Sequence, residues 1–487
     1  MLRFLYLGSG VPAAVASDEP FLMERVFAMM TTGDFNPRVY DYPTLYVYMQ
    51  TALASVRFLV GTLRGEWFSL AEVTSTDFYV WGRALTALIG TLTVVVAWRI
   101  GRRLGPAAGL WAAAFLAVNP QHVRESHFAL TDVPMTFFVT LTLLLSVRAA
   151  EAPALRSFAA AGAAAGLAAA TKYTAGVALV MPLVAIIWAR WNLADRLRAV
   201  PGVIVAAAVA FLLGAPYSLL DLPAFLNGFG YLASAHAGGT PPAVSPWWAY
   251  LLHLNILLGT PLVVMSIVGV AVGLVQMFRA DPPMRAVWAA AVIFVVIFYA
   301  ELSGQTLVYG RYLLPLMPAL LVIAGGAVSM LLTWSGPAID RTRHRGMLVA
   351  ALGVILMAVP LQQTAGLLSR MSKTSSNELA FAWMIEEIPG GARVAVEAEG
   401  MKLPPRFRAR NVGRLIDHSV EEYVAEGTEY LVASSLASRN AMAGGPTREG
   451  RAYAELFRNA QLLFAVTPTA DHPGSEIRVY RLVRPVP

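Results

Sequence analysis

The sequence predicts a polytopic α-helical membrane protein that ends in a small water-soluble α/β domain. Of its 487 residues, 57% are hydrophobic and only 14% are charged, whereas soluble proteins carry about 25% charged residues. Apolar runs bounded by arginines recur along most of the chain, as in proteins that cross a membrane repeatedly. After about residue 373 the charge rises and the apolar runs shorten to the length of strands.

Ten apolar runs span, or nearly span, the hydrocarbon core of a bilayer, which is about 30 Å thick. They lie at 80–98, 106–119, 133–149, 157–171, 174–189, 200–216, 255–278, 286–302, 313–333 and 347–365. Several are short, which is typical of helices that tilt or pack within a bundle.

Arginines predict the orientation, because cytoplasmic loops are enriched in positive charge. They cluster in alternate short loops, from Arg99, Arg102 and Arg103 at the end of the first run to Arg341, Arg343 and Arg345 before the last. We therefore expect a plasma or inner membrane protein in which residues 1–79 form a first extracytoplasmic loop, 80–366 a transmembrane domain and 373–487 an extracytoplasmic domain. Translocation of residues 1–79 needs a preceding helix, so we expect a missing upstream span, which would make eleven.

Charge and cysteine content exclude several classes of protein. The net charge of +7 comes largely from arginines near the ends of the apolar runs, so it favours a membrane surface over nucleic acid. The chain has no cysteine, which excludes disulfides, thiolate metal sites and cysteine nucleophiles.

The C-terminal segment alternates short strand-like and helix-like stretches. Runs rich in β-branched and aromatic residues predict strands at 393–397, 430–434, 462–466 and 477–482. Helical patterns cover 378–387 and 451–459, and Pro389-Gly390-Gly391 ends the first of them.

Asp18 and Glu19 begin an amphipathic stretch, Phe21–Thr31, that we expect to form a helix on the membrane surface. Asp18 has two compatible interpretations. It is placed to cap this helix, and a carboxylate fixed at the water–lipid boundary is able to deprotonate an acceptor hydroxyl. Farther along this loop, Arg38 either binds a lipid phosphate or reaches to lipid headgroups, and Tyr42 belongs to a group of aromatic residues that anchor at the interface.

A second extracytoplasmic turn, 121–134, carries several ionisable residues, among them His122, His127 and Asp132. Asp132 stands where a helix N-cap is expected, but the density of charge exceeds what capping requires. The two histidines lack the i, i+4 spacing of a helical metal pair, which disfavours a metal site and leaves a divalent ion open.

Two further cationic residues stand at the expected outer ends of apolar runs. Lys172 and Arg311, the latter followed by Tyr312, are each either a surface anchor or a phosphate ligand. Ionisable residues at such depth are functional candidates.

Short motifs in order along the chain resemble one family. They are Asp18-Glu19, Phe35-Asn36-Pro37, Tyr42-Pro43-x-Leu45, Ser126-His127-Phe128 with Thr131-Asp132-x-Pro134, Ala170-Thr171-Lys172-Tyr173, Ala215-Pro216-Tyr217 and Arg311-Tyr312-Leu313-Leu314-Pro315. Together they resemble the GT-C superfamily of polyprenyl-phosphate-sugar-dependent glycosyltransferases, family 39, near the protein O-mannosyltransferases and the aminoarabinose lipid A transferases. The tail after residue 373 is also similar to that family's outer C-terminal domain.

The resemblance implies a sugar transfer from a polyprenyl-phosphate donor to an acceptor hydroxyl of a protein, lipid or glycan at the outer face. It implies Asp18 as the catalytic base with Glu19 beside it, Asp132 as a second acidic residue of the site, and Arg311, Tyr312 and Lys172 near the donor phosphate. The aminoarabinose branch has Lys-Pro-Pro where this chain has Tyr42-Pro43-Thr44. The lysine of that stretch is therefore absent, and Arg38 is a candidate substitute.

Three other readings remain at this point: a ligase that transfers a whole oligosaccharide or polysaccharide, a secondary transporter, and a non-catalytic sensor. A transporter needs ionisable residues and broken helices near the middle of the bilayer, whereas charge here gathers at helix ends. The sequence leaves the sugar and the acceptor open.

Overall fold

The computed structural model describes residues 1–13, 18–237, 244–334, 342–397, 401, 403–404, 406–438 and 441–483. It divides into two compact units. The first comprises Met1–Leu7 and Leu22–Leu367, and the second comprises Gly8–Phe21 and Leu368–Pro487. Residues 8–21, which the sequence placed in one loop with the rest of 1–79, thus group with the C-terminal segment.

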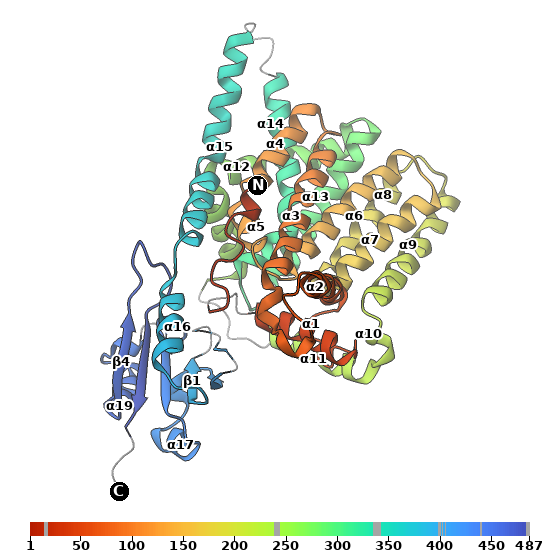
Figure 1. The fold of residues 1–487 in the computed structure, drawn as a ribbon. Coiled ribbons are helices and arrows are strands. Elements are labelled where there is room, and N and C mark those ends of the chain that lie inside the picture. The colour runs from red at the N-terminus through yellow and green to blue at the C-terminus, as the bar shows by residue number, and fades with distance from the viewer. Residues whose placement is uncertain are drawn as a thin grey trace. The chain divides into compact units, whose positions relative to one another are not determined.

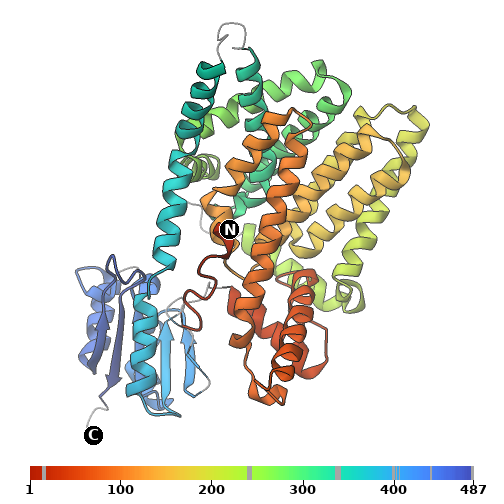
Figure 2. The same cartoon turned by 45° about the horizontal axis from the view of Figure 1, so that its top comes forward.

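The first unit is a helical bundle (Figures 1 and 2). Its helices are α1 (Glu19–Thr32), α2 (Leu45–Leu63), α3 (Tyr79–Gly101), α4 (Pro106–Ala117), α5 (Pro120–Glu125), α6 (Asp132–Glu151), α7 (Leu155–Thr171), η4 (Tyr173–Leu179), α8 (Val180–Trp188), α9 (Leu193–Gly214), α10 (Tyr217–Leu220), α11 (Leu222–Ala237), α12 (Pro246–Arg279), α13 (Pro282–Ser303), η5 (Gly310–Leu316), α14 (Met317–Trp334) and α15 (Thr342–Met371).

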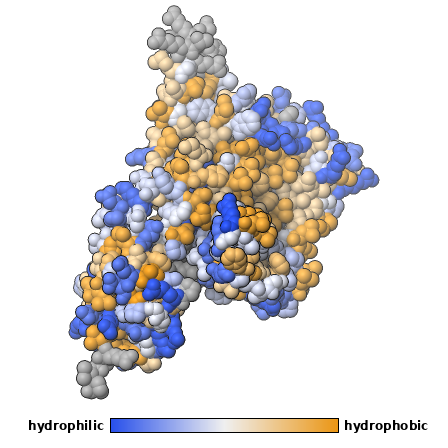
Figure 3. Space-filling view, in the orientation of Figure 1, coloured by the Kyte–Doolittle hydropathy of each residue, from blue (hydrophilic) through white to orange (hydrophobic). Residues whose placement is uncertain are grey.

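Each of the ten predicted apolar runs falls on a helix. Seven segments of the described chain are long and apolar enough to cross a membrane, and 106–117 and 173–188 are shorter apolar helices. Large apolar side chains are exposed along α9 and α12, including Val205, Leu213, Val264 and Ile267, and Figure 3 shows apolar side chains over much of the visible face of the bundle. The fold is therefore that of a multi-pass membrane protein.

The predicted helix at 21–31 is present as α1, but further helices lie where loops were expected. The longest of them are α2 and α11. Arg57 and several small or polar residues interrupt the apolar pattern of α2, so it did not stand out as a transmembrane run.

Glycine permits the closest helix packing in the bundle. A Cβ on Gly162 or Gly166 of α7 would lie 2.3 Å and 2.1 Å, respectively, from the carbonyl oxygens of Val203 and Ala207 on α9. Small residues four apart let two backbones approach in this way. Side chains of α3, α4, α6, α8, α12, α13 and α14 form the largest buried cluster.

The second unit is an α/β domain with a five-stranded sheet of order β2-β1-β3-β5-β4. The strands are β1 (Arg393–Glu397), β2 (Arg408–Val412), β3 (Tyr430–Ser434), β4 (Ala460–Val466) and β5 (Ile477–Leu482). β1 pairs in parallel with β2 and β3, whereas β5 pairs antiparallel with β3 and β4. All four predicted strands are confirmed. β2, which reads RARNV, was missed because an edge strand with exposed charged residues has no apolar pattern.

Helices cover both faces of this sheet, because side chains alternate along each strand. Val394 and Val396 pack with α16 (Ser376–Glu387) on one face. Ala395 packs on the other face with α17 (Val420–Ala425) and α19 (Arg448–Arg458). Helices 376–387 and 448–458 confirm the two helical stretches predicted at 378–387 and 451–459.

Candidate active site

A buried ion pair lies where two helices of the bundle meet. α6 begins at Asp132, and Lys172 follows the last residue of α7 in extended geometry (φ −156°, ψ 128°). The Nζ atom of Lys172 lies 2.8 Å from Oδ1 of Asp132, and the two side chains are 14% and 3% exposed. A charge-assisted hydrogen bond of this kind holds both groups in place. The structure thus brings together two residues that the sequence singled out 40 positions apart.

Tyrosine rings flank the lysine. Its Nζ atom lies 5.1 Å from the ring centroid of Tyr312 and 5.9 Å from that of Tyr42. The guanidinium of Arg311 lies 5.9 Å from the same Tyr312 ring. Tyr42 lies two residues before Thr44, which directly precedes α2 and whose hydroxyl donates to the carbonyl of Gly214 at 2.9 Å.

Lys172 and Tyr312 line a small polar cavity of about 20 Å³, which has room for about one water molecule. Asp132, Lys172, Gln305 and Tyr312 contribute its polar groups. The aromatic rings and the two cations make this a site suited to an anion, since cations bind over tyrosine faces and remain available to a phosphate.

Glu125 belongs to the same cluster, although it was not among the site residues predicted from the sequence. It ends α5, is 1% exposed, and its Oε1 accepts hydrogen bonds from Gln121 (2.7 Å) and Arg124 (2.5 Å). Its Oε2 has no hydrogen-bond partner among the described residues. Burial raises the pKa of this carboxyl and the charge of Asp132 adds to the shift, while Arg124 and Arg311 oppose it. The density of ionisable residues in the 121–134 turn was the signal that pointed to it.

The two histidines of that turn contact the N-terminal residues of the first unit. Arg3 is buried and donates to the carbonyl of Leu116 at 2.9 Å, and its Nη2 lies 3.0 Å from Nδ1 of His122. Burial, together with the charge of Arg3, lowers the pKa of His122 well below its usual value. That ring is therefore neutral and its Nδ1 accepts from the guanidinium.

His127 is held between two carbonyls. Its Nδ1 lies 2.7 Å from the oxygen of Val123 and its Nε2 lies 2.9 Å from that of Leu5. A neutral imidazole has one N–H and donates to one of these two carbonyls, so the ring lies between the turn and the 1–7 segment. The described residues contain no group of three or more His, Asp or Glu side chains placed to hold a metal ion.

Arg38 lies on the surface of the first unit. It forms an ion pair of 2.5 Å with Asp34, and its side chain is 70% exposed. That carboxylate hydrogen bond lowers the pKa of Asp34 and raises the pKa of Arg38.

Asp18 and Glu19 stand at the start of α1. Asp18 directly precedes the helix and is partly exposed, whereas Glu19 is its first residue and is fully buried. Both residues belong to the second unit, and Asp132 and Lys172 belong to the first.

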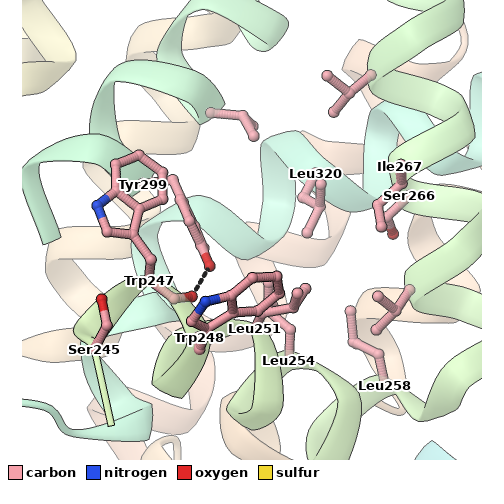
Figure 4. A pocket seen from close by; sticks show the side chains of 13 residues that line it. Ser245, Trp247, Trp248, Leu251, Leu254, Leu258, Ser266, Ile267, Tyr299 and Leu320 are labelled. Atoms are coloured by element: carbon pink, nitrogen blue, oxygen red, sulfur yellow. Dashed lines mark hydrogen bonds between the residues drawn. The ribbon is translucent and has the colours of Figure 1, made fainter. Parts of the chain in front are cut away.

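A large apolar cavity shares α13 with the polar one. Its volume is about 590 Å³, within the range of ligand pockets. It is lined by α12, α13 and α14, with Trp247, Trp248, Leu251, Leu254, Tyr299 and Leu320 among its walls (Figure 4). The hydroxyl of Tyr299 donates to the carbonyl of Trp247 at 2.6 Å and so ties two of these helices together. Tyr299 faces this cavity, while its neighbour Phe298 lines the polar one.

Comparison with known proteins agrees with this architecture. Residues 67–219 match the family of dolichyl-phosphate-mannose-protein mannosyltransferases. Among proteins of curated function, no sequence relative matches the chain.

Solved structures match over nearly the whole chain. ArnT from Cupriavidus metallidurans bound to undecaprenyl phosphate is 16% identical with a TM-score of 0.62, and the match covers 99% of this chain and 96% of ArnT. Apo ArnT gives 15% identity and a TM-score of 0.60, with 99% and 95% covered. An oligosaccharyltransferase from Archaeoglobus fulgidus is 11% identical with a TM-score of 0.53, over 95% of this chain and 69% of that one. Residues 67–219 are thus similar to this mannosyltransferase family, and the chain shares its fold with ArnT.

Proposed function

We propose that the chain is a glycosyltransferase that moves a sugar from a polyprenyl-phosphate donor to an acceptor hydroxyl at the outer face of a cell membrane. The observation that carries the proposal is the pairing of a buried cationic site with an apolar cavity on the same helix. Lys172 and Arg311 flank the Tyr312 ring, and the apolar cavity shares α13 with that site. A polyprenyl phosphate has the same two parts, an anionic head and a long apolar tail.

The cationic site supports binding of the leaving phosphate. In the reaction, the acceptor oxygen forms a bond to the anomeric carbon while the bond from that carbon to the phosphate oxygen breaks. The electron pair of the broken bond leaves with the phosphate, whose negative charge rises. Preorganised cations at that point stabilise the transition state more than the ground state. We assign this role to Lys172 and Arg311.

Asp132 positions Lys172 in this proposal. The 2.8 Å contact with the buried carboxylate fixes the position of the ammonium group. The rings of Tyr312 and Tyr42 lie 5.1 Å and 5.9 Å from the ammonium group, and Tyr312 lines the cavity beside it.

A carboxylate takes the proton that the acceptor hydroxyl loses. Asp18, with Glu19 beside it, is the proposed base, because a carboxylate at the start of α1 is held by the helix end and is partly exposed. Glu125 is the alternative. It has an oxygen without a hydrogen-bond partner among the described residues, and burial raises its pKa.

The length of α6 supports the outer location of the site. Asp132 begins α6, and Arg148 lies in its last turn. A 20-residue helix is about 30 Å long, the thickness of the hydrocarbon core. The arginine-rich ends of α3 and α6 face the cytoplasm by the positive-inside rule, so the polar site faces outward.

Transfer of label from a radiolabelled polyprenyl-phosphate sugar to a hydroxyl acceptor by the purified chain tests the proposal. Lys172→Met should abolish transfer, whereas Lys373→Met, which removes the same charge from the second unit, should not. Release of sugar that is equal in both variants, or equal to that of a boiled sample, would contradict the proposal. The mass of the group transferred separates single-sugar transfer from transfer of a whole oligosaccharide.

A further inference from the structure

A second cationic pocket lies at the end of α6 opposite Asp132. It has a volume of about 470 Å³ and is lined by Trp98, Arg99, Arg102, Arg103 and Arg148, here called the arginine pocket. Four of its residues come from the last turn of α3 and the residues just after it, and Arg148 comes from the last turn of α6. The proposed transfer reaction uses none of these residues.

Positive charge in the pocket exceeds what the chain itself neutralises. Arg103 pairs with Glu151 at 2.6 Å and donates from Nη1 to the carbonyl of Arg99 at 2.9 Å. Arg99, Arg102 and Arg148 form no ion pair with any residue that the structure describes. Helix C-termini favour nearby cations, but each helix end supplies only about half a charge. Several guanidinium groups around one hollow repel one another unless an anion lies among them.

The arginine side chains indicate which kind of anion binds. Arginine binds phosphate through paired N–H donors. Several arginines around one space bind a phosphate more tightly than they bind a carboxylate. Arg102 is also ordered, since its guanidinium lies 4.8 Å from the ring centroid of Trp98. Such stacking fixes the side chain before a ligand arrives.

The surface of α3 indicates that the phosphate belongs to a lipid. Leu88, Leu92 and Val95 are 49%, 43% and 40% exposed. At intervals of three or four residues they share one helical face with Arg99 and Arg102. An exposed apolar stripe therefore leads along the membrane-spanning helix directly to the arginine pocket. A phospholipid with its chains along the stripe places its headgroup among the arginines, and a tryptophan at that level is typical of the membrane interface.

We infer that the arginine pocket binds the phosphate headgroup of an anionic phospholipid in the leaflet on the arginine-rich side of the membrane. Basic pockets between transmembrane helices recognise such headgroups in other membrane proteins. The bound lipid lies at one end of α6 while Asp132 lies at the other. Occupancy therefore stabilises the helix pair α3–α6 that carries the polar site.

Native mass spectrometry of the purified full-length chain in detergent, titrated with phosphatidylglycerol or with phosphatidylcholine, tests this inference. We expect the anionic lipid to bind more tightly. Arg102→Gln with Arg148→Gln should weaken its binding by about 30-fold, from about 1 kcal/mol for each arginine. Arg190→Gln with Arg279→Gln removes the same charge from the ends of other helices and should leave binding unchanged.

Two further measurements separate the effect of charge from that of the guanidinium group, and a lipid from free phosphate. Arg102→Lys with Arg148→Lys retains charge, so it should fold like the parent and bind with an intermediate affinity. Inorganic phosphate, added as a competitor, should not displace the lipid at equal concentration. Equal affinity for the two lipids, equal loss in both Gln pairs, or displacement by phosphate alone would overturn the inference.

Discussion

Replacing Lys172 by Met separates the structural role of the buried ion pair from its proposed role in donor binding. The pair is 2.8 Å long, and both side chains are largely buried. Removing the cation leaves the Asp132 carboxylate buried without its counter-charge, which costs about 3–5 kcal/mol of stability. The same change removes the proposed charge-assisted contact to the donor phosphate, which would be worth about 1.5–3 kcal/mol, or about 10- to 150-fold in affinity.

The double variant Asp132→Asn with Lys172→Met tells the two effects apart. It leaves no uncompensated charge, so its unfolding temperature in detergent should return most of the way to that of the parent. Affinity for undecaprenyl phosphate, measured by calorimetry, should stay low because the phosphate ligand is still missing. If the double variant recovers donor affinity together with stability, Lys172 only supports the fold and the assignment is wrong.

The remaining predictions address the base, the second cation, the buried carboxyl and the helix packing. Asp18→Asn should lower transfer by about 100-fold or more without loss of stability, because Asn and Asp cap helices almost equally well; near-normal transfer would move the role of base to Glu125. Arg311→Gln should weaken donor binding by about 10-fold or more while the unfolding temperature stays unchanged, and unaltered affinity would remove it from the site. Burial raises the pKa of Glu125, so the folded state binds its proton more tightly than the unfolded state does. The parent should therefore lose stability relative to Glu125→Gln as the pH rises above about 4.5, the usual pKa of the group, and a pH-independent difference between the two would contradict this. Gly166→Val should prevent the packing of α7 on α9 and abolish the folded protein, whereas Gly202→Ala, with open space around its Cβ position, should fold, as size-exclusion chromatography would show.

Much of the fold could be predicted because the membrane restricts the backbone. Polar backbone groups must pair within each segment in lipid, so an apolar run of sufficient length specifies a helix by local sequence alone. Each of the ten runs falls on a helix for that reason. The same logic holds in the second unit for strands whose buried faces alternate, such as 393–397.

Elements without a strong local pattern were harder to predict. α2 carries Arg57 within an otherwise apolar stretch, and β2 exposes its arginines at the edge of the sheet. In both, neighbours in the fold supply the contacts that local sequence does not reveal.

For the site, the sequence by itself determined which residues bear charge at the ends of apolar segments, and so selected Asp132, Lys172 and Arg311. Only the tertiary structure decided that the first two pair at 2.8 Å, that Glu125 is buried beside them with one free oxygen among the described residues, and that Arg38 pairs with Asp34 on the surface. Local composition governs whether a segment enters lipid, because burial of apolar area is nearly additive along the chain. Pairing of buried charges depends on distances between helices, and those distances come from packing across the whole bundle, down to glycines such as Gly166 against Ala207.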